Sequence, residues 1–158
     1  MISNSSNIGD QNNPQSRLSY WLPPILWMAA IFYFSTDTFS GGNTGSLFYT
    51  IFHKLFPSLT LEQFQPIHHF IRKAGHFTEY AVFALLLFRA FRAGSILRWN
   101  WCWAVYSLAV VVVYALLDEL HQTFTRTRGG SIYDSLLDIS GGATALLLLW
   151  GVRGRQGY

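Results

Sequence analysis

Two long apolar runs, residues 101–117 and 139–152, are joined by a stretch that carries an unusual share of the chain's charge. Four of the eight acidic residues fall within that stretch, residues 116–142. They are Asp118, Glu119, Asp134 and Asp138. An acid at the centre of a bilayer-spanning helix costs roughly 2.5–3.5 kcal/mol, so four without partners would cost about 10 kcal/mol, comparable to the whole stability of a domain. The chain must therefore fold so that these acids lie near a membrane interface, pair with basic groups or carry protons.

The composition favours a membrane protein with one domain. Of the 158 residues, 51% are hydrophobic and only 12% are charged, against about 25% in soluble domains. The net charge of +3 comes from arginines in short loops and indicates contact with anionic lipid. No nucleic-acid partner is predicted, because no basic stripe alternates with exposed aromatic residues. The single cysteine cannot form an intrachain disulfide, and the Cys and His spacing fits no zinc motif, so neither a metal nor another cofactor is predicted.

Four apolar segments predict an all-α membrane protein, a bundle of four transmembrane helices. The spans cover about residues 18–36, 67–91, 99–123 and 131–152. Residues 1–17, rich in Asn, Ser and Gln, are predicted to form a disordered tail, and residues 153–158 a short basic tail. The transmembrane domain therefore covers residues 18–152.

The segment between the first two spans predicts an amphipathic helix that lies in the membrane interface. Apolar residues recur at helical spacing from Leu47 to Phe56, and Pro57 ends the pattern. Residues 60–63, Thr-Leu-Glu-Gln, have the spacing of a capping box and predict a further short helix before the second span. We expect this segment to be a packing lid over the bundle rather than a gate for a substrate.

The basic residues are slightly more numerous on the side of the two termini, which predicts a cytoplasmic N-terminus and C-terminus. On that topology, the polar starts of the second and fourth spans and the polar end of the third span meet at the outer membrane surface. Three helices then contribute to one polar pocket. Its predicted binding residues are Lys73, His76, Glu79, Tyr80, Asp118, Glu119, His121, Gln122, Arg126, Arg128, Asp134 and Asp138.

Some of these residues also have a purely structural interpretation. Ser131 and Asp134 have the spacing of a capping box, and Glu119 can simply face water. Asp138 lies one helical turn further into the fourth span, where helix capping no longer explains an acid. Asp118 lies near the C-terminus of the third span, where the helix dipole is unfavourable for a negative charge. Both of these acids therefore need partners.

Small residues follow the acids on the same face of the fourth span. Gly141 and Ala145 continue the helical face that carries Asp134 and Asp138. Small side chains let a neighbouring helix approach closely, so we expect these carboxyl groups at a seam between helices.

Three short motifs carry a resemblance to a known family. They are RKAGHFTEY at residues 72–80, DELHQ at residues 118–122, and a pattern that runs from Arg128 through Ser131, Asp134 and Asp138 to Gly141. With these motifs in this order, most of residues 20–151 resembles the VanZ-like family of small multi-pass bacterial membrane proteins. That family is named for a member associated with low-level teicoplanin resistance. The resemblance implies a role in the cell envelope and a location in the bacterial inner membrane.

Two functions remain open. In the first, the polar pocket binds an envelope lipid, a cell-wall precursor or a glycopeptide without chemistry, with glycopeptide resistance as the phenotype that the resemblance implies. In the second, the chain is an enzyme acting on a lipid-linked phosphate or acyl group. Its acid–base candidates are Asp118, His121, Asp138 and His76.

Binding is favoured because no nucleophile stands out among the polar residues. A structural ion-pair network that only holds the bundle together is a third alternative. Besides the lipid or precursor, a second copy of the chain is a candidate partner.

Overall fold

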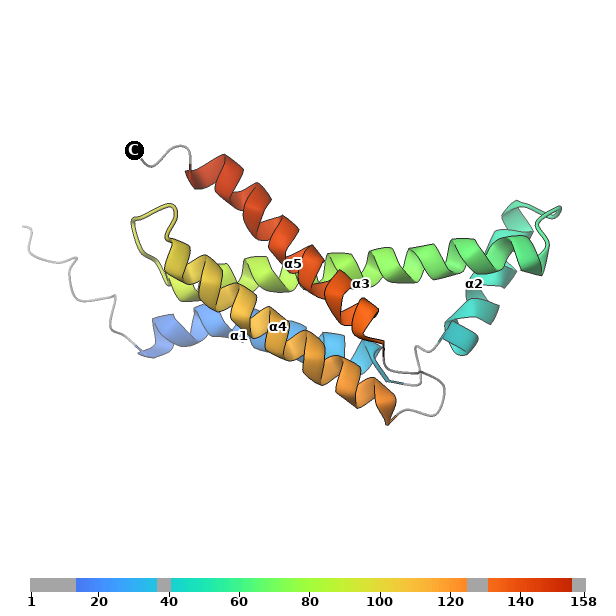
Figure 1. Cartoon of the computed structure of the whole chain (residues 1–158), viewed down its shortest axis with the longest axis horizontal. Coiled ribbons are helices and arrows are strands. Elements are labelled where there is room, and N and C mark those ends of the chain that lie inside the picture. The colour runs from blue at the N-terminus through green and yellow to red at the C-terminus, as the bar shows by residue number, and fades with distance from the viewer. Residues whose placement is uncertain (1–13, 37–40, 125–130, 155–158) are drawn as a thin grey trace, which may run out of the picture.

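The computed structural model describes residues 14–36, 41–124 and 131–154, and in these ranges it contains five helices and no strand. The helices are α1 Pro14–Phe34, α2 Gly41–Leu55, α3 Leu61–Arg92, α4 Trp101–Thr123 and α5 Ile132–Arg153 (Figure 1). The predicted all-α class is therefore confirmed for the part of the chain that is described. Helix α1 begins inside the tail predicted for residues 1–17, since Pro14 is its first residue.

Two of the helices are long and apolar enough to cross a membrane, α4 with 23 residues and α5 with 22. Only 28% of each apolar window is buried inside the protein, which is unlike the core helix of a soluble domain. Helix α1 contains a shorter apolar stretch, Leu18–Phe34. Among the helices described here, two of the four predicted spans thus have the length and composition of a membrane span by themselves.

The helices α1, α3, α4 and α5 alternate in direction. The Trp27 indole donates a hydrogen bond to the Glu79 carbonyl (2.9 Å), and the Tyr114 hydroxyl donates one to the Met28 carbonyl (2.6 Å). These contacts place α1 beside α3 and α4, and Figure 1 shows that α1 and α4 run one way whereas α3 and α5 run the other way. This arrangement brings the end of α4, the start of α5 and the first half of α3 to the same region.

Helices α3 and α5 approach each other closely at Gly141. A Cβ atom added at Gly141 would lie 2.2 Å from the backbone oxygen of Phe77, so only glycine fits there. A Cβ at the adjacent Gly142 would lie 3.0 Å from Val111 of α4. The sequence predicted that small residues on this face of α5 let a neighbouring helix approach closely. The structure agrees, because Gly141 lies against α3 and Gly142 against α4.

Large aromatic and aliphatic side chains fill the space between α1, α3 and α4. Tyr80 and Phe83 are completely buried, and the Phe83 and Tyr114 rings lie 5.4 Å apart, edge to face. Large apolar residues also face outward along the helices, including Leu26 on α1, Val105 on α4 and Leu148 on α5. The core is thus narrow, and the outer surface is apolar as well, which suits a lipid environment.

Helix α3 corrects one prediction. Thr60 caps it with the predicted capping box, but the result is one helix of 32 residues rather than a short helix followed by a span. Pro66 removes one backbone hydrogen bond without ending the helix. The physical reason is packing against α2, since Phe64, 2% exposed, contacts the rings of Tyr49 and Phe52.

Helix α2 includes the predicted amphipathic segment and begins before it, at Gly41. Tyr49 and Phe52 face α3, while Leu47 and Leu55 are 63% and 68% exposed. The helix packs on the first half of α3, beyond the other helices (Figure 1). It therefore presents uncovered apolar residues next to the polar end of the bundle.

Candidate functional site

Polar side chains from three helices gather where α3, α4 and α5 meet. We call this group the polar cluster. It comprises Lys73, His76, Glu79 and Tyr80 of α3, Asp118, Glu119 and Gln122 of α4, and Asp134, Ser135 and Asp138 of α5. Nine of these residues were predicted from the sequence, and Ser135 was not. The predicted Arg126 and Arg128 lie outside the described residues.

His121, a further predicted site residue, lies elsewhere. Its ring stacks at a tilt on Phe32 of α1, with 4.5 Å between ring centroids. No hydrogen bond reaches its Nδ1 atom from the described residues. His121 therefore lies between α4 and α1 rather than at the seam with α5, and among the four acid–base candidates it is the one set apart.

Asp138 is the deepest acid of the cluster, with 2% of its surface exposed. Its Oδ1 atom lies 3.9 Å from His76 Nδ1, an ion-pair distance that is too long for a hydrogen bond. Within the described chain this Oδ1 atom has no hydrogen-bond partner. Four other carboxyl groups lie near enough to act on it electrostatically, namely those of Asp118, Asp134, Glu119 and Glu79.

Asp118 faces the same seam from α4 and is 4% exposed. The Gln122 amide donates a hydrogen bond to its Oδ2 atom (3.1 Å), one turn further along the helix. The completely buried Tyr80 also interacts with this carboxyl group. Its Oδ1 atom and the Tyr80 hydroxyl both lack a partner at full hydrogen-bond geometry among the described residues, although the two side chains interact.

Two buried carboxyl groups with an unsatisfied oxygen each are unusual, because nearly all buried polar atoms in native proteins have a partner. Leaving such an atom unpaired costs about 1–3 kcal/mol, and more for a charged group. Each of these two oxygens can still accept a hydrogen bond from water or another donor. Of the described residues, no group of three or more His, Cys, Asp or Glu side chains is placed to hold a metal ion.

The rim of the cluster is held by contacts that the sequence did not indicate. Asp134 forms an ion pair with Lys73, whose side chain is 38% exposed. Ser131 is the residue before α5, but its side chain makes no capping hydrogen bond, so the predicted capping box with Asp134 is wrong. Asp134 instead turns toward α3, because the close α3–α5 contact brings a lysine within its reach.

Glu119 also corrects an expectation. It is 9% exposed rather than facing water, and its carboxylate accepts a hydrogen bond from the backbone N–H of Ser131. Glu119 of α4 therefore satisfies a backbone donor of the residue that precedes α5. This contact links the two helices that carry the buried acids.

A pocket of about 250 Å³ opens beside His76 and Glu79. Its other lining residues come from α1, α2 and α3, and are Phe34, Thr44, Phe48, Ile71, Arg72 and Gly75. Neither Arg72 nor the apolar members were among the predicted site residues. The amphipathic sequence pattern that includes Phe48 could have identified this residue as a site residue. No local sequence pattern, in contrast, indicates that the end of α1 reaches this pocket.

Gly75 lines that pocket without a side chain. A Cβ atom added there would meet nothing within 4 Å. The missing side chain therefore leaves space open rather than permitting a helix contact, which distinguishes Gly75 from Gly141.

Comparison with known proteins places these observations in a family. The family model described as VanZ/LLP1 matches residues 20–153, which include most of α1 and all of α2 to α5. Neither the curated proteins nor the solved structures contain a match to this chain. Together with the outward-facing apolar residues of α4 and α5, the family match indicates a membrane protein. Because the matched region covers most of the chain and all of the described polar cluster, the protein belongs to the VanZ/LLP1 family.

Proposed function

We propose that this protein is a four-span protein of the bacterial inner membrane whose polar cluster binds an envelope ligand from the outer side. The ligand class is an envelope lipid, a lipid-linked cell-wall precursor or a glycopeptide. Binding without chemistry is the principal proposal, and glycopeptide resistance is the phenotype it would explain.

The four-span arrangement is supported by the alternating directions of α1, α3, α4 and α5. Each of these helices carries large apolar side chains on its outer surface, including Leu22 of α1 and Leu85 of α3. Helix α3 begins polar and becomes apolar after Tyr80, and within the bundle Lys73 and His76 of its polar half face acids of α5 rather than lipid. Arginines at the opposite end of the bundle from the polar cluster favour that opposite end as the cytoplasmic one.

The observation that carries the binding proposal is the pair of buried, incompletely hydrogen-bonded carboxyl groups of Asp118 and Asp138. Carboxylate oxygens accept hydrogen bonds, so the matching ligand groups are hydroxyls, amides or amines. Arg72 lines the adjacent pocket and supplies a donor for phosphate or carboxylate. A sugar- or amine-bearing phospholipid and a lipid-linked precursor both combine these groups with an apolar tail.

Helix α2 adds a further argument for an amphipathic ligand. Its Phe48 lines the pocket, while its neighbour Leu47 is 63% exposed. A helix in the membrane interface with this arrangement would bring the pocket to the level of lipid head groups. The ligand would then reach the cluster from the bilayer surface.

The test compares ligand binding by the purified wild type with binding by Asp138→Asn and Gly75→Leu. Native mass spectrometry with a polar lipid extract of a bacterial membrane detects bound lipid, and fluorescent teicoplanin tests the glycopeptide. We expect both variants to lose about tenfold or more in affinity, from a missing carboxyl oxygen and from a filled pocket respectively. Glu62→Gln, an exposed acid-to-amide change at the start of α3, is the matched control. Equal binding by all four proteins would refute the proposal.

An alternative function is that of an intramembrane enzyme acting on a lipid-linked phosphate or acyl group. The specific observation in its favour is the contact between His76 and the buried Asp138, a pairing of acid–base groups. The hydroxyl of Ser135, in contrast, is completely buried and turned toward the Ala115 carbonyl (3.5 Å). Turnover of a lipid-linked substrate that Asp138→Asn abolishes while binding persists would favour the enzyme over the binding protein.

A further inference from the structure

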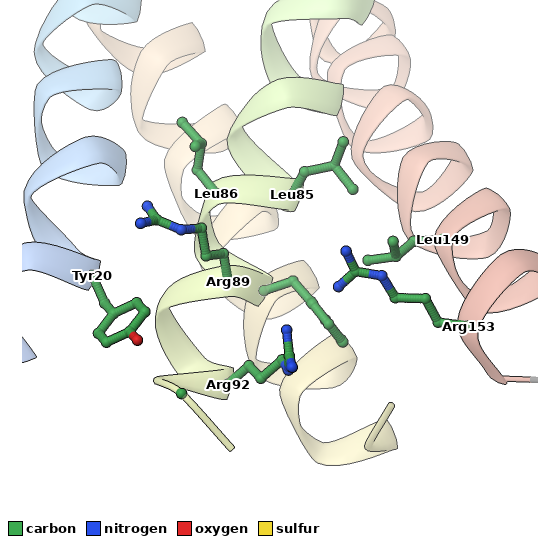
Figure 2. A pocket seen from close by; sticks show the side chains of 9 residues that line it. Tyr20, Leu85, Leu86, Arg89, Arg92, Leu149 and Arg153 are labelled. Atoms are coloured by element: carbon green, nitrogen blue, oxygen red, sulfur yellow. The ribbon is translucent and has the colours of Figure 1, made fainter. Parts of the chain in front are cut away.

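A second polar pocket lies at the end of the bundle opposite the polar cluster. It has a volume of about 580 Å³ and is bounded by α1, α3 and α5. We call it the basic pocket. Its lining residues are Tyr20, Leu85, Leu86, Phe88, Arg89, Arg92, Gly94, Leu149 and Arg153 (Figure 2). We propose that the basic pocket binds the phosphate group of an anionic phospholipid, with the acyl chains against its leucine wall.

The charge around this pocket is unbalanced in the described part of the chain. Three arginines line it, and the nearest acid earlier on α3 is Glu79. Ten residues of helix separate Glu79 from Arg89, about 15 Å at 1.5 Å per residue. On α5, Asp138 lies about 22 Å along the helix from Arg153, calculated with the same rise per residue. The described acids are therefore too distant to neutralise these arginines. An anionic ligand in the pocket would neutralise them.

Two of the arginines are held in position by other groups. The Arg89 guanidinium lies over the Tyr20 ring, 5.4 Å from its centroid. Arg92 donates hydrogen bonds from Nε to the Leu97 carbonyl (3.0 Å) and from Nη2 to the Ser95 carbonyl (3.1 Å). A guanidinium carries five N–H donors, so these contacts orient Arg92 and leave donors for a ligand.

Arg153 reaches the pocket from the other side. Figure 2 shows its side chain extending from α5 toward α3, with Leu149 of the preceding turn next to it. Arginine side chains from two helices thus approach one space. Forked guanidinium groups suit a phosphate, whose oxygens accept several charge-assisted hydrogen bonds.

The apolar half of the lining favours a lipid over a free phosphate. Leu85 and Leu149 extend the pocket toward the outer surface of α3 and α5, where Leu85 is 39% exposed and Val152 is 66% exposed. A soluble anion would make no use of these side chains, whereas acyl chains would cover them. Basic pockets between helices at one membrane surface are a general mode of phospholipid head-group binding.

The experiment measures lipid binding by the full chain, purified in a neutral detergent. Native mass spectrometry follows titration with phosphatidylglycerol, with phosphatidylcholine and with inorganic phosphate. We expect phosphatidylglycerol to bind at least about tenfold more tightly than phosphatidylcholine, and inorganic phosphate to compete weakly. Arg153→Gln should lower phosphatidylglycerol affinity by about tenfold, and Arg153→Lys, which keeps the charge but not the fork, by less.

Two controls make the result specific. Arg98→Gln removes the same charge from the α3–α4 connection but lies outside the lining of the basic pocket, so phosphatidylglycerol affinity should be unchanged. The loss of affinity caused by Arg153→Gln should be the same in the wild type and in an Asp138→Asn background, because Asp138 does not line the basic pocket, so the two proposals succeed or fail separately. Equal affinity for both lipids, an equal loss in Arg98→Gln, or competition by inorganic phosphate at the lipid's own concentration would each overturn the proposal.

Discussion

Replacing Gly141 by alanine tests the helix contact on which the polar cluster depends. The added Cβ would lie 2.2 Å from the Phe77 carbonyl oxygen and 3.0 Å from the Phe77 carbonyl carbon. An ordinary van der Waals separation of about 3.4 Å requires α5 to move away from α3 by about 1.2 Å. The obstructing atoms belong to the backbone, so no side-chain rotation can relieve the contact.

The expected cost follows from these distances. Overpacking in a well-packed core costs about 1–3 kcal/mol, and a backbone obstruction belongs near the upper end of that range. Alanine recovers up to about 1 kcal/mol because glycine is the poorer helix former. We therefore expect the free energy of unfolding to fall by about 2 kcal/mol.

Gly151→Ala provides a matched control on the same helix. A Cβ at Gly151 meets nothing within 4 Å, so the substitution should stabilise α5 by up to about 1 kcal/mol. The assay is reversible unfolding in mixed detergent micelles, followed by circular dichroism. Gly141→Ala should unfold first, wild type next and Gly151→Ala last. If Gly141→Ala is as stable as Gly151→Ala, the close α3–α5 contact is refuted.

Two further predictions concern contacts between helices. Lys73→Gln breaks the ion pair that joins α3 to α5, but both side chains are more than one third exposed, so the free energy of unfolding should fall by less than about 1 kcal/mol. Lys54→Gln on exposed α2 serves as its control, and a loss of several kcal/mol in Lys73→Gln alone would contradict the interpretation. Tyr114→Phe removes the hydrogen bond to the Met28 carbonyl and should cost about 1 kcal/mol in the same assay. The exposed Tyr106 lies on the same helix, and equal effects of Tyr114→Phe and Tyr106→Phe would show that this bond contributes nothing.

Local patterns in the sequence predicted most of the helices well. The spans predicted at residues 99–123 and 131–152 correspond to α4 at Trp101–Thr123 and α5 at Ile132–Arg153. Their apolar runs are long, and polar residues bound them on both sides. Helix α3 was harder, because Pro66 is a local signal against helix and its packing partners on α2 are distant in sequence.

The sequence by itself determined which helix ends are polar, because hydrophobic periodicity and charge placement are local properties of the chain. Only the tertiary structure decided which of these polar groups form pairs. Asp134 pairs with Lys73, 61 residues away, rather than with its neighbour Ser131. The pocket beside His76 likewise depends on how α1, α2 and α3 converge. Such contacts follow from the directions and closeness of packed helices, which glycines such as Gly141 permit but no local pattern specifies.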